Sequence, residues 1–324
     1  MRLFKYFQAE WLLRWQNVDR PLVAIVGPTG SGKSELALKI AQAFSGEIVN
    51  CDALQLYRGF DIGTAKTPPD ARRGIPHHLI DALDPPTSFS AGDYARAAKE
   101  IISGISSRGH LPLVVGGTGF YLRALLEGLP PMPGRHDLLR ERLRRREQRR
   151  PGALHKLLCR LEPSAAARIH PRDMQKTTRA LEIRLLTGKA LPPPAVAVSL
   201  SGFRLFQIGL APERSLLADA IATRTRQMFT AGLVEEVRGL LEQGLSGDEK
   251  PFESLGYKQA LAYLRGGISL EQAVESTTIK TRQYAKRQLT WFRGDPRIIW
   301  FTGFGFEPAI AEKCLEALGK FLSE

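Results

Sequence analysis

The sequence has few cysteines and no long uninterrupted apolar stretch. Its three cysteines, Cys51, Cys159 and Cys314, are too few and too scattered for a disulfide framework, and they lack the paired spacing of a zinc site. A reducing, cytoplasmic location is therefore expected. No run reaches the roughly 20 apolar residues that a membrane-spanning helix needs, so no membrane partner is expected.

Positive charge, in contrast, is abundant. The 324 residues include 46 Lys or Arg and 33 Asp or Glu, which gives a net charge of +13 and a pI near 9.9. Such an excess raises the local concentration of polyanions, and nucleic acid is the first candidate. The alternative is an Arg-rich composition that only promotes solubility.

Short apolar runs alternate with helical patterns in the first third of the chain. Residues 22–26, 48–51 and 111–115 predict buried strands, whereas residues 35–44 and 91–103 predict helices. Strands that alternate with helices favour an α/β fold with a parallel, doubly wound sheet.

The alternation of predicted strands and helices ends at Pro130. Residues 134–188 have helical character throughout, residues 203–210 return to strand character, and a long helical pattern covers residues 216–241. The Gly-, Pro- and Asp-rich segment 59–88 is predicted to be loop. The predicted parts are an amphipathic extension (1–20), the first part of an α/β core (21–130), an all-helical insertion (131–202) and the second part of the core with basic C-terminal helices (203–324).

Residues 27–34 read Gly-Pro-Thr-Gly-Ser-Gly-Lys-Ser and match the phosphate-binding pattern G-x-x-x-x-G-K-[ST] at every position. Glycines let backbone N–H groups approach phosphate oxygens, and the following helix presents its positive end to the same anion. Lys33 is predicted to neutralise phosphate charge, and the Ser34 hydroxyl to ligate Mg²⁺. The predicted phosphate-binding residues are Gly27, Thr29, Gly30, Ser31, Gly32, Lys33 and Ser34.

An acidic residue is missing where an NTPase usually has one. The strand at residues 111–115 ends in Gly116-Gly117, without a carboxylate that could organise Mg²⁺ and water. The strand at residues 48–51 leads instead to Asp52, which could organise magnesium or act as a general base. The loop alone leaves both roles open.

The residues after Asp52 carry a more specific signal. Residues 52–59 (DALQLYRG) and 61–66 (DIGTAK) resemble the second signature of tRNA dimethylallyltransferases, and the resemblance extends over about residues 21–300. Further segments of that family follow in order at residues 76–81, 89–94, 116–121, 173–176 with 179–182, and 281–288.

This resemblance implies transfer of a dimethylallyl group from dimethylallyl diphosphate to N6 of adenosine 37, just 3′ of the anticodon in tRNA, with release of pyrophosphate. An exocyclic adenine amine is a poor nucleophile because the ring withdraws its lone pair, so Asp52 is implied as the base that accepts the N6 proton. Mg²⁺ at Ser34 is the implied cofactor. Arg179 is implied as a further cation on the leaving group, and Thr118 as a neighbour of the reacting centre.

The target base is stacked in the anticodon stem-loop, so it must be extruded into a pocket. Two basic runs, residues 135–150 and 280–293, are predicted to contact tRNA phosphates. The aromatic residues of the second run, Tyr284, Trp291 and Phe292, suit either base stacking or core packing. The tRNA-binding residues implied by resemblance are Asp52, Ala53, Leu54, Gln55, Arg140, Gln175, Lys176, Thr177, Thr178 and Arg179.

Three positions depart from the family pattern: Ala53 stands in place of the usual Ser, and Met174 and Lys176 stand where Arg is common. Because Lys lacks the planar fork of Arg, tRNA preference or rate is expected to differ. His77-His78 has no companion ligand cluster, so a role in fixing the loop is expected rather than metal binding.

Three alternative functions stay open. An isopentenyltransferase that uses free AMP or ADP needs no long basic surface, and a P-loop kinase or ATPase needs the missing strand-end carboxylate. A binding module without catalysis would leave the phosphate loop and Asp52 unexplained. A monomer that clasps one tRNA is the expected assembly.

Overall fold

The structure is a computed structural model that describes residues 20–130, 132–191 and 200–324. The chain divides into a larger unit, formed by Met1–Glu127 and Val198–Glu324, and a smaller unit, Gly128–Ala197. The amphipathic pattern expected in the first 20 residues lies outside the described residues, except for Arg20.

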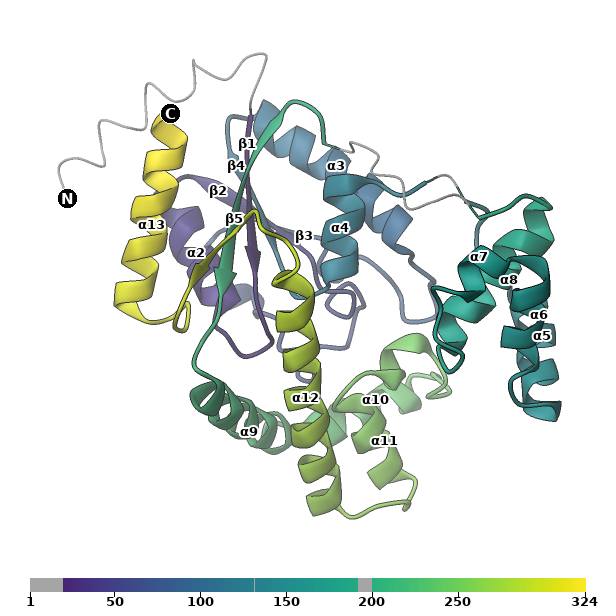
Figure 1. Cartoon of the computed structure of the whole chain (residues 1–324). Coiled ribbons are helices and arrows are strands. Elements are labelled where there is room, and N and C mark those ends of the chain that lie inside the picture. Colours follow the sequence, from purple (N-terminus) through teal and green to yellow (C-terminus); the bar gives the residue numbers. More distant parts are fainter. Residues whose placement is uncertain (1–19, 131, 192–199) are drawn as a thin grey trace. The chain divides into compact units, whose positions relative to one another are not determined.

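The larger unit contains a six-stranded, fully parallel sheet in the order β3-β2-β4-β1-β5-β6 (Figure 1). The predicted α/β fold with a parallel sheet is therefore confirmed. The strands are β1 (Arg20–Val26), β2 (Gly46–Asn50), β3 (His77–His78), β4 (Leu111–Val115), β5 (Phe203–Leu210) and β6 (Ile298–Phe301).

Two of these strands were not predicted. The expected loop at residues 59–88 is wrong at His77–His78, which pairs with Ile48 and Val49 of β2, and at a short 3₁₀ turn, η1 (Pro69–Arg72). A two-residue strand is too short to show a period, so only its pairing reveals it. β6 likewise joins the opposite edge of the sheet through β5.

Both faces of the sheet are covered by helices, which explains why β4 and residues 22–26 of β1 are apolar on both sides. Along β1, Leu22, Ala24 and Val26 pack into one core cluster, whereas Val23 and Ile25 pack into the other. The first cluster includes residues of α3 (Ala91–Ser107) and α4 (Gly119–Glu127), and the second residues of α2 (Lys33–Ala43) and α13 (Pro308–Ser323) (Figure 1).

The helical pattern expected over residues 216–241 is two helices rather than one. Gly232 adopts a left-handed conformation (φ 102°), which a glycine tolerates and which ends the first helix. The remaining elements of this unit are α9 (Arg214–Thr230), α10 (Leu233–Glu242), the 3₁₀ turn η2 (Lys250–Glu253), α11 (Tyr257–Leu264) and α12 (Leu270–Phe292).

The smaller unit has its own core, built from Leu143, Leu154, Leu158 and Leu181 with neighbouring alanines. In its described residues the regular elements are all helices: α5 (Asp137–Arg149), α6 (Ala153–Leu161), α7 (Pro163–Ala166) and α8 (Met174–Thr187). Among the described parts of the chain, no helix is both long enough and apolar enough to cross a bilayer.

Candidate active site

The carboxyl ends of three adjacent strands bring the predicted site residues of the larger unit together. β4 lies between β1 and β2, and Val115 at its end is in register with Ile25 and with Asn50. The segments that follow these strands border one cavity of about 720 Å³. It is lined by Thr29, Gly30, Gly32, Lys33, Ser34, Asp52, Gln55, Gly116 and Gly117, and by Arg224, Tyr284 and Gln288 among others.

The phosphate-binding loop has the backbone shape that its glycines allow. Gly32 has φ 82°, and a Cβ at this position would lie 2.9 Å from the backbone nitrogen of Gly305. That nitrogen donates a 2.9 Å hydrogen bond to the Ser31 carbonyl, so the turn before α13 supports the loop. Ser31 is fully buried, and its Oγ has no hydrogen-bond partner among the described residues.

Two buried cations line this cavity, Lys33 and Arg224, of which only Lys33 was predicted. Lys33 Nζ donates a 2.8 Å hydrogen bond to the Pro28 carbonyl, and Arg224 Nη1 donates to Thr29 Oγ1 at 3.4 Å. Arg224 comes from α9, where it follows the buried Leu217 and Ile221 at helical spacing. An arginine on an otherwise apolar helix stripe is the signal that could have identified it.

The charge of the Lys33 side chain changes with pH in the range near pH 8. Burial, together with repulsion from Arg224, lowers the pKa of Lys33 from 10.5 to about 8, against the attraction of Asp52. The free protein therefore loses this proton as the pH rises through about 8. A bound diphosphate favours the ammonium form and raises the pKa again.

We therefore expect diphosphate binding at about pH 8.5 to take up a fraction of one proton, and binding at about pH 6.5 to take up almost none. Calorimetry in buffers with different ionisation enthalpies measures this uptake. Lys33→Ala should abolish it. An uptake that persists in this variant would assign the proton to another group.

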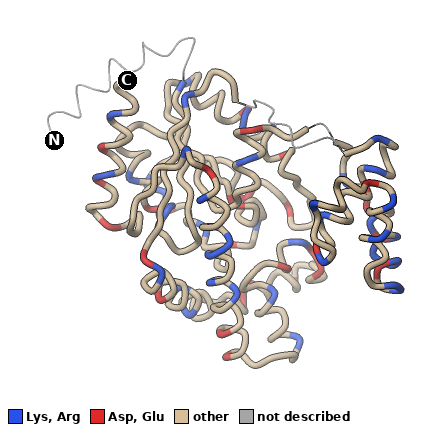
Figure 2. Tube along the Cα trace, viewed as in Figure 1, with Lys and Arg blue, Asp and Glu red and all other residues tan. Residues whose placement is uncertain are grey.

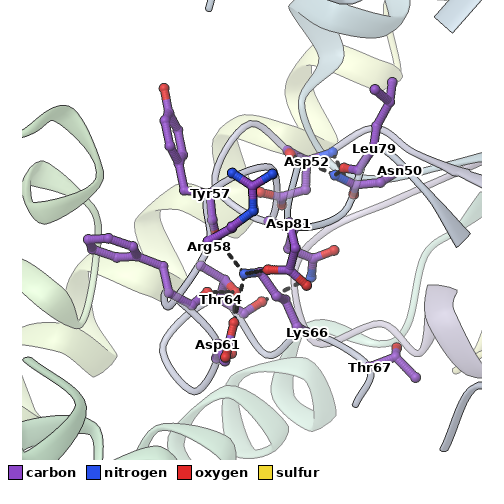
Figure 3. A network of polar contacts seen from close by, with 12 residues as sticks. Asn50, Asp52, Tyr57, Arg58, Asp61, Thr64, Lys66, Thr67, Leu79 and Asp81 are labelled. Atoms are coloured by element: carbon purple, nitrogen blue, oxygen red, sulfur yellow. Dashed lines mark hydrogen bonds and ion pairs between the residues drawn. The ribbon is translucent and has the colours of Figure 1, made fainter. Parts of the chain in front are cut away.

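Asp52 is held firmly at the end of β2. Its Oδ1 accepts a 2.9 Å hydrogen bond from the backbone nitrogen of Leu54, and its own backbone nitrogen donates to Asn50 Oδ1 at 3.0 Å. Asn50 Nδ2 in turn donates to the Leu79 carbonyl (Figure 3). Thr118 Oγ1 accepts a hydrogen bond from the backbone nitrogen of Ala53, so this predicted site residue fixes the segment beside Asp52.

Comparisons with known proteins assign this arrangement to a family. A family model described as IPP transferase matches residues 55–295, and one described as isopentenyl transferase matches residues 21–75. A tRNA dimethylallyltransferase from Solibacter usitatus is 53% identical over 94% of this chain and all of the relative. The chain belongs to the IPP transferase family.

Solved structures agree with this assignment. The tRNA isopentenylpyrophosphate transferase of Bacillus halodurans is 38% identical, with a TM-score of 0.70 over 94% of this chain and 97% of that one. A eukaryotic dimethylallyltransferase acting on tRNA is 27% identical, with a TM-score of 0.80 over 94% of this chain and 80% of that one.

In this IPP transferase, a buried lysine makes hydrogen bonds and ion pairs that hold the segment after Asp52 in place. Lys66 Nζ contacts the Tyr57 carbonyl, Asp61 Oδ1 and Asp81 Oδ1, and only 4% of its side chain is exposed (Figure 3). Its neighbour Ala65 and also Asp81 have positive φ, a conformation that costs free energy for residues other than glycine. Lys66 thus compensates for backbone strain in the segment that presents Asp52.

α12 contributes a second residue that sequence reasoning missed. Gln288 accepts a 2.8 Å hydrogen bond from the Thr29 backbone nitrogen and donates one of 2.9 Å to the Gly117 carbonyl. It therefore joins the phosphate loop to the end of β4. Of the three aromatic residues in the basic run, Phe292 packs in the core, Tyr284 lines the cavity and Trp291 is 46% exposed.

The remaining predicted residues lie in the helical unit. Arg140 and Arg179 both contact Glu182, while Gln175 and Lys176 are exposed and Thr178 is half-buried. Thr177 is fully buried. The arginines of α5 are mostly exposed; the lysines and arginines of the chain are blue in Figure 2.

In the part of the chain that the structure describes, no group of three His, Cys, Asp or Glu side chains could hold a metal. His77 Nδ1 lies 2.8 Å from the Ile75 carbonyl oxygen, and His78 Nε2 lies 2.7 Å from Glu47 Oε2. Both histidines thus form hydrogen bonds at the edge of the sheet, where β3 replaces the expected loop.

Proposed function

We propose that this chain transfers a dimethylallyl group from dimethylallyl diphosphate to N6 of adenosine 37, the base 3′ of the anticodon in tRNA. The observation that carries the proposal is a single cavity that combines a phosphate-binding loop, two buried cations and one fixed carboxylate. The names of the relatives, which include tRNA dimethylallyltransferases and a tRNA isopentenylpyrophosphate transferase, support the same reaction.

The proposed reaction divides the cavity between two substrates. The diphosphate lies on the backbone amides of residues 29–34, with Lys33 and Arg224 against its oxygens. Asp52 accepts the proton from N6 while the nitrogen bonds to C1 of the prenyl group and the C1–O bond breaks. Pyrophosphate leaves with that electron pair, and the two cations stabilise its developing charge. Thr118 holds the segment that carries Asp52, and Arg179 is a further cation for the leaving group.

Mg²⁺ is the proposed cofactor. The Ser34 hydroxyl lines the cavity and, like diphosphate oxygens, is a hard donor of the kind that Mg²⁺ prefers. Because the described residues offer no carboxylate cluster, we propose that the ion arrives with the diphosphate, whose charge it neutralises when bound.

tRNA is proposed to contact Asp52–Gln55, Arg140 and Gln175–Arg179, with α5 of the helical unit and the basic side of α12 on its phosphates. Arg142, Arg146, Arg149 and Arg150 are exposed and have no ion-pair partner among the described residues. We propose that the enzyme works as a monomer in the cytoplasm, where its tRNA substrate is found.

Binding of tRNA should depend steeply on salt. If about six phosphates are contacted, raising the salt concentration from about 50 to 200 mM weakens binding by about 10³-fold. Filter binding or fluorescence anisotropy with an unmodified anticodon stem-loop measures this slope. A flat response would exclude the basic helices as the binding surface.

The decisive assay mixes the protein with labelled dimethylallyl diphosphate, Mg²⁺ and unmodified tRNA and follows label into the tRNA. Parallel reactions replace tRNA by AMP or ADP, and the prenyl donor by ATP. Label in the tRNA, with no reaction in the other two, is the expected result. Prenylated AMP would favour the free-nucleotide reaction, and phosphate release from ATP a kinase or ATPase.

A further inference from the structure

A carboxylate is completely buried in the helical unit, between two arginines implied in tRNA binding. Glu182, in α8, has 0% of its side chain exposed. Its Oε1 accepts hydrogen bonds of 2.8 Å from Arg140 Nε and from the His136 backbone nitrogen. Its Oε2 accepts one of 2.8 Å from Arg140 Nη2 and one from Arg179 Nη1.

These contacts keep Glu182 charged. Burial by itself would raise the pKa of the carboxyl group, but the hydrogen bonds from Arg140, His136 and Arg179 outweigh it and lower the pKa to about 2. At neutral pH, the negative charge of Glu182 therefore contacts the positive charges of Arg140 and Arg179. The group of three side chains has a net charge of +1.

The same contacts fix the orientation of both arginines. Glu182 binds the guanidinium of Arg140 through two parallel hydrogen bonds, and Arg179 also donates to the Pro133 carbonyl at 2.7 Å. Because the two guanidiniums share Oε2, they lie side by side. Their side chains remain 29% and 34% exposed, so N–H groups that Glu182 does not use are within reach of solvent. Arginines held in this way lose little entropy when they bind an anion.

Packing alone does not account for this arrangement. α5, α6 and α8 already share an apolar core that includes Leu143, Leu158 and Leu181. A buried ion pair commonly adds little to stability compared with apolar residues of the same size. What the carboxylate adds is a fixed geometry for two cations that stay partly open to solvent.

We propose that Glu182 is a positioning residue, which holds Arg140 and Arg179 as one rigid pair, with Arg140 on a phosphate of the tRNA backbone and Arg179 on the leaving pyrophosphate. The inference rests on the proposed function, because tRNA is its ligand. The wild-type assay is therefore done first. If no label enters tRNA, the proposed function fails. That result is distinct from a failure of the Glu182 proposal, which the variants below test.

The test replaces Glu182 by Gln in the full-length protein, with Glu162→Gln as the matched control. Glu162 is also buried in the helical unit, but it pairs with a single arginine, Arg184, at 3.3 Å. Three quantities are measured: the single-turnover rate at saturating tRNA, the affinity for an unrelated RNA, and the thermal unfolding midpoint.

Glu182→Gln should reduce the single-turnover rate by at least about tenfold, because misdirected cations misplace the substrate. It should also strengthen binding to the unrelated RNA by up to about threefold, because a negative charge has been removed. Glu162→Gln should leave the rate within about twofold. A lower rate together with a higher affinity for RNA distinguishes a positioning role from a folding defect. A loosened helical unit would lower the rate and the affinity together.

Equal losses of rate and affinity in both glutamine variants would overturn the proposal and leave Glu182 a purely structural role. If Glu182→Gln does not fold, Arg140→Lys is measured instead. Lysine keeps the positive charge of arginine but lacks the planar guanidinium that makes two parallel hydrogen bonds. A slower rate with unrelated-RNA affinity within about twofold of the wild type supports the proposal. An unchanged rate overturns it.

Discussion

Asp52→Ala is expected to reduce the rate of prenyl transfer by about 10²- to 10⁴-fold, the range that a general base contributes. The adenine N6 must lose a proton as it bonds to carbon, and Asp52 is the carboxylate that the structure fixes at the end of β2. Binding of tRNA should stay within a few-fold of the wild type. Single-turnover incorporation of labelled prenyl group, with a parallel binding titration, measures both quantities.

A second variant of Asp52 and one control variant test whether this residue acts as a base or only supports the local backbone. Asp52→Asn keeps an oxygen that can accept the hydrogen bond from the Leu54 backbone nitrogen, but it cannot take a proton. It should be about as inactive as Asp52→Ala. Asp70 is an exposed carboxylate that lines the same cavity, so Asp70→Ala should retain most of the activity. An active Asp52→Asn enzyme would show that the residue organises the turn and is not the base.

Lys33→Ala is expected to raise the KM for the prenyl diphosphate, or to lower kcat, by at least tenfold. Lys33 and Arg224 are the buried cations that line the cavity beside the phosphate loop. A cation in a site partly withdrawn from water stabilises a developing negative charge more strongly than a cation in bulk water does. A loss mainly in kcat would mean that Lys33 acts on charge that develops as pyrophosphate leaves. A loss mainly in KM would mean that it binds the ground state.

Lys39→Ala is the matched control for this variant. Lys39 lies in the same helix, α2, but its ammonium contacts the Phe306 carbonyl. Its loss should change both kinetic constants by less than about twofold, as expected for a surface contact. If Lys33→Ala behaves like this control, the diphosphate role of Lys33 is wrong and Arg224 becomes the principal cation.

Several features were predictable because they depend on residues close together in the chain. A strand, a glycine-rich turn and a helix start lie within about twenty residues, and their pattern located the phosphate loop. Asp52 was recognisable because it directly follows a buried strand. Parallel strands end at the same edge, so the meeting of these two segments also followed from the predicted fold.

Other features depend on contacts that no local pattern contains. Thr29 meets Gln288 across 259 positions of sequence and Arg224 across 195. The break at Gly232 and the pairing of β3 were missed for a related reason: a single glycine and a two-residue strand hardly change a hydrophobic period.

By itself, then, the sequence determined the class of fold, the phosphate loop, the carboxylate opposite it and the resemblance to a family. Only the tertiary structure decided which other side chains join the site: Arg224 and Gln288 at the cavity, and Glu182 between Arg140 and Arg179. The physical reason is that burial and charge pairing are properties of three-dimensional neighbours. The sequence shows that a helix carries an arginine or a glutamate, and packing decides whether that side chain faces water, a substrate or a buried partner.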